Sequence, residues 1–263
     1  MKTTKYKIVI IGAGNVATQL GAALQKSQNT IVQVLSKHSS SASSLAKSLK
    51  CAYTTSYEDL DATADIYIIA VKDDAITEVA QSLRLKNRIV VHTSGSVPME
   101  VLKSTSKNYG VFYPLQTFSK NNKVDFKIVP VCLEANNNAT FNVLQLLAKN
   151  ITNDVQKVNS EQRKVIHLAA VFACNFSNHL YAIASTILSS TDLSLDILKP
   201  LIEETAKKIR KDTPVNMQTG PAVRDDKKIM QNHLKMLSGK KEYQQIYKLM
   251  SKSISDFNKQ KKQ

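Results

Sequence analysis

The stretch Ile8–Leu20, IVIIGAGNVATQL, constrains the fold of this 263-residue chain more than any other feature. Its four consecutive β-branched residues, at positions 8–11, are typical of a parallel strand buried on both faces. Gly12 suits a sharp turn, and Gly14 lets a diphosphate approach the amides that open the following helix. With Ala17 in third place, the stretch matches the G-x-G-x-x-G/A pattern of dinucleotide-binding turns. A tight strand-to-helix turn without a ligand is the alternative.

The residues that follow predict a doubly wound parallel sheet. A second apolar strand at 30–35 comes after the first helix and completes a β-α-β unit of about thirty residues. Further strands are expected at 65–71, from residue 88, and in FKIVPVCLEA. Strands that alternate with helices favour an α/β, Rossmann-type domain, which we place at residues 1–157.

The rest of the chain has a helical pattern. The first domain is expected to end with a helix at 138–149 and a short strand near residue 155. From Ser160 the apolar residues recur with helical periodicity almost to the end, which predicts an all-α C-terminal domain over residues 158–263. The expected helices run from residue 160 past 188 and over residues 195–210, 226–238 and 241–257.

The charge of the chain bears on its partners. The formal net charge of +15 is spread over both halves of the sequence rather than gathered in one basic stretch. A nucleic-acid-binding protein usually concentrates its basic residues on one surface, so we expect no nucleic acid as partner. Diffuse positive charge instead favours encounter with an anionic cofactor or substrate.

Cysteines and apolar runs indicate the compartment. Cys51, Cys132 and Cys174 are far apart and form no C-x-x-C pair, so we expect three buried thiols and neither a disulfide nor a metal site. The apolar runs are far shorter than the roughly 20 residues that a membrane-spanning helix needs. We expect no secretory segment, because residues 1–5 lead directly into the first strand. We therefore predict a cytoplasmic protein without a membrane partner.

Residues directly after the strands are candidates for cofactor binding, because ligands of such sheets lie beyond the carboxyl ends of the strands. After the second strand stands Ser36-Lys37-His38-Ser39, without the carboxylate that commonly binds the ribose of NAD. A lysine among hydroxyl groups suits a 2′-phosphate, which favours NADP over NAD, and a solvent-directed Lys37 is the alternative. The predicted cofactor-binding residues are Gly12, Gly14, Asn15, Val16, Ser36, Lys37, Val71, Lys72, His92 and Thr93.

Two segments after later strands can be interpreted in two ways. In VKDDAI, Lys72 borders the expected groove, while Asp73 and Asp74 more simply cap the next helix. In HTSGSVP, the residues from His92 to Ser94 stand where a nicotinamide ring would lie, or else form a tight turn with a helix cap.

The segment HLAAVFACNFSNHLYAI carries the candidate catalytic residues. His167, Asn175 and Asn178 share one helical face, and His179 borders it. The surrounding alanine and aromatic residues predict that this face is buried, so its polar groups need a substrate, a cofactor or a neighbouring chain as partner. A core histidine with a satisfied hydrogen bond is the alternative. We predict catalytic roles for His167, Asn175, His179 and Ser94, with His167 as proton donor because imidazole titrates near neutrality.

A second polar stretch, QTGPAVRDD, supplies candidate substrate residues. Arg224 suits a carboxylate or a phosphate, and Asp226 is placed to orient Arg224 or His233. A salt bridge between the domains is the alternative. The predicted substrate residues are Asn178, Gln218, Thr219, Arg224 and Asp226.

The segments GAGNVATQL, VKDDAI, HTSGS, YPLQTFS, AAVFACNFSNHLY and QTGPAVRDD together resemble a known family. Its members are Rossmann-like proteins with a C-terminal helical domain of unknown function, labelled NADP oxidoreductases of the deazaflavin-coenzyme-dependent type. The first half is more distantly similar to pyrroline-carboxylate reductases and β-hydroxyacid dehydrogenases. The Lys-x-x-x-Asn helix of the latter is absent, since this chain has His167 and Asn175 instead. The resemblance implies the fold, NADP and a helical dimerisation domain, but no particular reaction.

We therefore expect an NADP(H)-dependent oxidoreductase that acts on a small carbonyl, imine or hydroxy metabolite in a cleft between the domains. The chain is expected to form a homodimer through its helical domain. A non-catalytic NADP-binding regulator or scaffold protein is the alternative, because the same first domain serves both functions.

Overall fold

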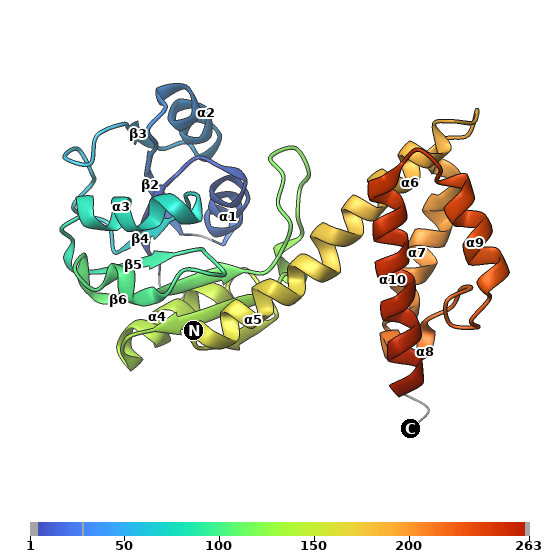
Figure 1. Ribbon diagram of the computed structural model, residues 1–263. Coiled ribbons are helices and arrows are strands. Elements are labelled where there is room, and N and C mark those ends of the chain that lie inside the picture. Colours follow the sequence, from blue (N-terminus) through green and yellow to red (C-terminus); the bar gives the residue numbers. More distant parts are fainter. Residues whose placement is uncertain (1–4, 28, 261–263) are drawn as a thin grey trace. The chain divides into compact units, whose positions relative to one another are not determined.

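The computed structural model describes residues 5–27 and 29–260, and Figure 1 shows their helices and strands. The chain forms two compact units that divide after Cys174. The first unit contains a sheet of eight strands in the order β3-β2-β1-β4-β5-β6-β7-β8. Neighbouring strands are parallel except for β6 and β7, which are antiparallel. The strands are β1 (Lys7–Ile11), β2 (Thr30–Leu35), β3 (Ala52–Thr54), β4 (Ile66–Ile69), β5 (Lys86–His92), β6 (Ser106–Pro114), β7 (Val131–Ala135) and β8 (Val155–Lys157).

Both faces of this sheet are covered by apolar side chains. Ile8 and Ile10 belong to a cluster with Leu20, whereas Val9 and Ile11 belong to a second cluster. Because alternate residues of a strand point to opposite faces, β1 is buried on both sides, as its unbroken apolar sequence predicts. The helices of this unit are α1 (Asn15–Lys26), α2 (Ser39–Leu49), α3 (Ile76–Ser82), α4 (Asn138–Lys149) and α5 (Ser160–Ala170).

The second unit is helical. Its helices are α6 (Ser177–Leu188), α7 (Lys199–Lys208), α8 (Pro214–Met217), α9 (Lys227–Met236) and α10 (Lys241–Gln260). The single helix expected from residue 160 past 188 is interrupted by the π-helical segment η4 (Val171–Phe176). The short α8 was not predicted, since its residues lie in a segment with turn-type composition. The predicted fold class, a doubly wound α/β sheet followed by an all-helical region, is confirmed.

The end of the first unit differs from the predicted boundary after residue 157. The unit extends to Cys174 and so includes α5. The reason is a buried arginine of α5: Arg163 donates hydrogen bonds to the carbonyl oxygens of Ser94 and Val97, which follow β5. Helical periodicity reports where a helix begins, but not which sheet or helix it packs against.

The cysteines are not all buried. Cys132 is buried and Cys51 is half-buried, but Cys174 is exposed, so the prediction of three buried thiols is wrong for Cys174. Within residues 5–27 and 29–260, no group of three or more His, Cys, Asp or Glu side chains is arranged to hold a metal ion. The helices of the same residues include none long and apolar enough to cross a membrane.

Candidate functional site

The turn after β1 requires glycine at position 12. Gly12 has φ +117°, a conformation that side chains disfavour, and its amide donates to the carbonyl oxygen of Leu35 at 2.7 Å. A Cβ on Gly12 would overlap the carbonyl oxygen of Ala70, which follows β4. Gly12 therefore serves the fold itself.

Gly14 has no such reason to be glycine. Its φ of −83° suits any residue, and a Cβ placed there would meet no described atom within 4 Å. Gly14 is the N-cap of α1, and no side chain caps this helix end. The first amides of a helix have no partner within the helix and favour an anion. The fold therefore does not require glycine at position 14, whereas a bound diphosphate would use the open space beside it.

A groove of about 410 Å³ runs along the carboxyl ends of β1, β2 and β4. This volume lies in the usual range for small-molecule sites. From the turn after β1, its lining includes Gly12, Gly14, Asn15 and Val16. Ser36 and Lys37 line it after β2, and Val71 and Lys72 line it after β4. The structure thus brings together eight of the ten predicted cofactor residues.

Tyr57 also lines this groove and was not predicted. It comes from the irregular connection between β3 and β4, where no periodicity or motif marks a site. Lys37 itself is paired: its Nζ lies 2.9 Å from Oε1 of Glu78, in α3. The hydrogen bond to Glu78 raises the pKa of Lys37.

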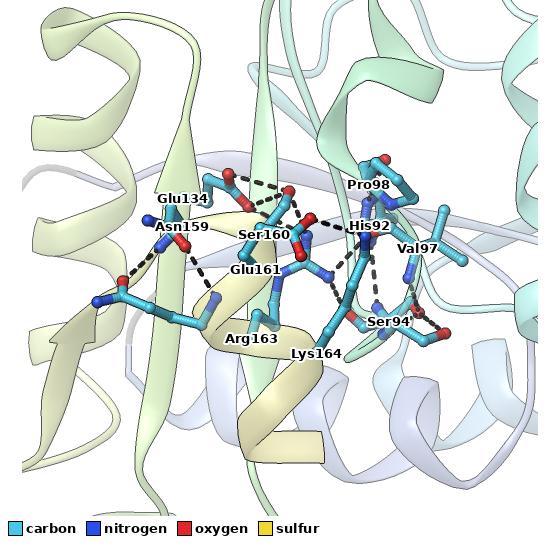
Figure 2. Close-up of polar contacts among 12 residues, drawn as sticks. His92, Ser94, Val97, Pro98, Glu134, Asn159, Ser160, Glu161, Arg163 and Lys164 are labelled. Atoms are coloured by element: carbon cyan, nitrogen blue, oxygen red, sulfur yellow. Dashed lines mark hydrogen bonds and ion pairs between the residues drawn. The ribbon is translucent and has the colours of Figure 1, made fainter. Parts of the chain in front are cut away.

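The other two predicted cofactor residues, His92 and Thr93, are buried at the end of β5 and are not among the residues that line the groove. His92 Nδ1 accepts a hydrogen bond from the amide of Ser94 at 3.2 Å, so Nε2 carries the hydrogen and faces the carbonyl oxygen of Pro98 at 3.4 Å (Figure 2). Burial, and next the charge of Arg163, lower the pKa of His92 to about 4. His92 is therefore neutral at pH 7 and shapes the turn after β5.

Ser94, a predicted catalytic residue, is also bound within this turn. Its Oγ accepts hydrogen bonds from the amides of Ser96 at 3.1 Å and Val97 at 3.0 Å. Asp73, expected to cap the helix that follows β4, instead accepts a hydrogen bond from Ser96 Oγ at 2.5 Å. The polar groups of HTSGSVP are thus bonded within the segment or to neighbouring parts of the first unit, which corresponds to the tight-turn alternative.

A buried ion pair holds this turn against α5, and sequence analysis missed it. Arg163 is fully buried and donates to the carbonyl oxygens of Ser94 (2.9 Å) and Val97 (2.8 Å) (Figure 2). Its other terminal nitrogen lies 3.0 Å from Glu134 Oε2 in β7 and 3.1 Å from Ser160 Oγ. The available signal was a carboxylate in the otherwise apolar strand VCLEA, which needs a partner when buried.

One turn further along α5, His167 packs against the same turn. Its Nδ1 lies 3.3 Å from the hydroxyl oxygen of Tyr113 in β6, and the two rings meet edge to face with centroids 6.4 Å apart. A Cβ on Gly95 would lie 2.8 Å from His167 Nδ1 and 2.9 Å from Tyr113 Cζ, so only glycine allows this approach. Burial raises the pKa of Tyr113 to about 12, so its phenol stays protonated.

The remaining predicted residues of the helical segment lie in the second unit. Asn175, Asn178 and His179 are exposed, so the expectation that their face is buried is wrong. The apolar neighbours Phe172 and Phe176 are also exposed, by 63% and 50%. The alanine and aromatic neighbours in the sequence therefore did not predict the exposure of these polar side chains correctly.

The residues of QTGPAVRDD do not form the predicted pairs. Gln218, Thr219 and Arg224 are exposed. Asp226 is the N-cap of α9, and its carboxylate accepts from the amide of Ile229 at 3.1 Å rather than orienting an imidazole. His233 instead bonds through Nδ1 to the hydroxyl of Tyr247 at 2.9 Å.

Comparisons with known proteins match both parts of the chain. Residues 7–95 match the family model "NADP oxidoreductase coenzyme F420-dependent", and residues 129–254 match a domain of unknown function, DUF2520. A crystal structure from Bacteroides fragilis, provisionally named an NADP oxidoreductase, is 43% identical with a TM-score of 0.91, over 96% of this chain and 98% of that chain. A comparison with curated proteins found no match.

Two more distant structures share the fold. The 1-pyrroline-5-carboxylate reductase from Streptococcus pyogenes is 13% identical with a TM-score of 0.63, over 96% of this chain and 99% of that chain. An imine reductase from Myxococcus stipitatus, in complex with NADP⁺, is 16% identical with a TM-score of 0.59, over 95% of this chain and 92% of that chain.

Proposed function

This chain belongs to the same family as the Bacteroides fragilis protein, and on that premise we propose that it is an NADP(H)-dependent oxidoreductase acting on a small carbonyl, imine or hydroxy compound. The observation that carries this proposal is Gly14, a glycine that the fold does not need, beside an uncapped helix end in a 410 Å³ groove. The NADP⁺ complex of the distantly similar imine reductase adds support for the cofactor.

Residues of the first unit would hold the cofactor. The amides after Gly14 would bind the diphosphate, and Asn15 and Val16 would line its path. Ser36 and Lys37, after β2, would bind the 2′-phosphate through a hydroxyl and an ammonium group. When bound, NADPH would supply the hydride.

The protein would supply the proton, and His167 is the proposed donor. In its protonated form, Nδ1–H would donate to the Tyr113 oxygen, which fixes the ring, while Nε2–H is the bond that breaks. The proton would pass to the oxygen or nitrogen that gains charge on the substrate, and His167 would remain neutral. Tyr113 would orient the His167 ring, and its raised pKa keeps its phenol from ionising.

Other candidates stay proposals for substrate binding or catalysis. They are Ser94, Asn175, Asn178, His179, Gln218, Thr219, Arg224 and Asp226. We also propose a homodimer through the second unit, supported by the large apolar side chains of α6 that remain exposed, such as Leu180, Tyr181 and Ile187. Sedimentation equilibrium of the full chain at several concentrations tests the dimer.

Replacement of Gly14 by valine tests the cofactor site. Valine is compatible with the extended backbone at this position, and its Cβ would meet no described atom within 4 Å, so Gly14→Val should fold. Its side chain would occupy the space proposed for the diphosphate, so NADPH affinity should fall at least tenfold by calorimetry, about 1.4 kcal/mol. The control is Ala139→Val, which adds bulk at an exposed position in the first turn of α4.

Two results would contradict the proposal. The first is a wild-type protein that shows no heat with NADPH up to millimolar concentration, and the second is an unchanged affinity in Gly14→Val. If NADPH binds but no member of a carbonyl and imine library leads to its oxidation, the non-catalytic alternative is favoured instead. Loss of turnover in His167→Ala, with NADPH affinity retained, would support the assigned proton donor.

A further inference from the structure

Glu78 places a carboxylate beside the group proposed to bind the 2′-phosphate. Its Oε1 lies 2.9 Å from Lys37 Nζ, and the side chains are exposed by 66% and 59%. Lys37 lines the groove after β2, whereas Glu78 comes from α3, on a different connection of the sheet. Tyr57 lines the same groove, and both charges act on the pKa of its phenol, which burial raises. Residues that follow β2, that lie between β3 and β4, and that belong to α3 thus come together at this end of the groove.

The sequence directly after β2 lacks the carboxylate that commonly accepts hydrogen bonds from the ribose of NAD. The fold supplies one from α3 instead. A 2′-phosphate carries nearly two negative charges at pH 7, so Lys37 attracts it and Glu78 repels it. NAD has a neutral hydroxyl at this position, which a carboxylate does not repel and can bind.

We propose that Glu78 is a specificity-determining residue of the groove, which pairs with Lys37 and thereby limits the preference for NADP(H) over NAD(H). This inference rests on the proposed function, because it assumes that the groove holds a nicotinamide dinucleotide. An ion pair as exposed as Lys37–Glu78 contributes little to folding stability, so its carboxylate can be removed without loss of the fold.

The experiment measures dissociation constants of NADPH and NADH for the full chain by calorimetry. Glu78→Gln should tighten NADPH binding by about three- to fivefold, the size of one exposed charge interaction, and should leave NADH unchanged or slightly weaker. Lys37→Met should weaken NADPH binding and leave NADH nearly unchanged. In the double variant the gain from Glu78→Gln should be smaller than in the wild type, because the two residues are coupled.

The matched control is Glu161→Gln, which removes the carboxylate of an exposed ion pair with Lys164, 2.8 Å long, in α5. This variant should change neither dissociation constant. If Glu78→Gln leaves the ratio of NADPH to NADH affinity unchanged, the inference about Glu78 is overturned. The proposed function still stands in that case, provided that the wild type binds NADPH. Absence of binding of either dinucleotide to the wild type would overturn both.

Discussion

The groove after β1, β2 and β4 and the turn after β5 are both polar, but they differ in what satisfies their polar groups. In the groove, Gly14 leaves an uncapped helix end open, and the Lys37–Glu78 pair is exposed. In the turn, His92 and Ser94 are buried and bonded to neighbouring backbone groups.

The two regions lie at the same edge of one sheet, but only the groove leaves polar groups accessible to a ligand, whereas the turn uses its polar groups to hold the fold. A polar residue after a parallel strand is a better candidate for ligand contact where it stays exposed than where it is buried and bonded within the protein. After β5 the guanidinium of Arg163 holds the turn carbonyls, so this turn presents a fixed surface to Tyr113 and His167. We therefore propose that the groove binds the ligand, whereas the turn provides the surface on which the proposed proton donor packs.

The largest effect is expected from Arg163→Met. It leaves the buried Glu134 carboxylate without its cationic partner, and such losses cost about 3–5 kcal/mol of unfolding free energy. Urea denaturation followed by circular dichroism measures this change. The contrasting variant is Lys37→Met in the groove, which removes an exposed pair and should cost at most about 1 kcal/mol. Equal losses of unfolding free energy in the two variants would contradict the view that the turn is held by buried contacts and the groove is not.

The second prediction concerns acid stability. A histidine titrates near pH 6.5 in an unfolded chain, whereas His92 has a pKa of about 4 in the folded protein. Between these values the unfolded chain binds more protons than the native protein, so the unfolding free energy falls as the pH drops from about 6.5 to about 4. The contribution of His92 reaches about 3 kcal/mol.

Denaturation curves at several pH values measure this dependence. His92→Gln should lack it, while His38→Gln, at an exposed position, should keep it. The same loss of stability on acidification in wild type and His92→Gln would show that other groups cause it.

A smaller effect is expected from Gly95→Ala. The added methyl group would press on His167 and Tyr113 and should cost about 1–3 kcal/mol. In a His167→Ala background the same change should cost less, because one of the two contacts is gone, and a double-mutant cycle from urea denaturation measures the coupling. Additive losses would mean that His167 does not pack on Gly95 in solution.

The fold was predictable because its signals are local. The β-branched run of β1, the glycines after it and the helical periodicity from Ser160 each lie within a few residues of the element that they specify. The change to a π-helix at Val171–Phe176 has no such local signal.

The site was predictable only where one segment determines it. Gly12, Gly14 and Lys37 follow from the strand-turn-helix pattern, and they line the groove. The roles of His92 and Ser94 depend on Arg163, which is 69 positions from Ser94, and the Lys37–Glu78 pair joins residues 41 positions apart. Periodicity and motifs do not report such pairings, so the partners that bury or neutralise a polar residue appear only in the folded chain.

Hydrogen exchange of the full chain with and without NADPH is the sharpest test of the proposed cofactor site, because it reports which amides the cofactor protects. NADPH should protect the peptide that carries residues 12–17 and the one that carries residues 36–38. It should leave residues 94–97 unchanged, because the amides of Ser94, Ser96 and Val97 are already bonded within the protein. Unchanged exchange in residues 12–17 at saturating NADPH would contradict the proposed cofactor site.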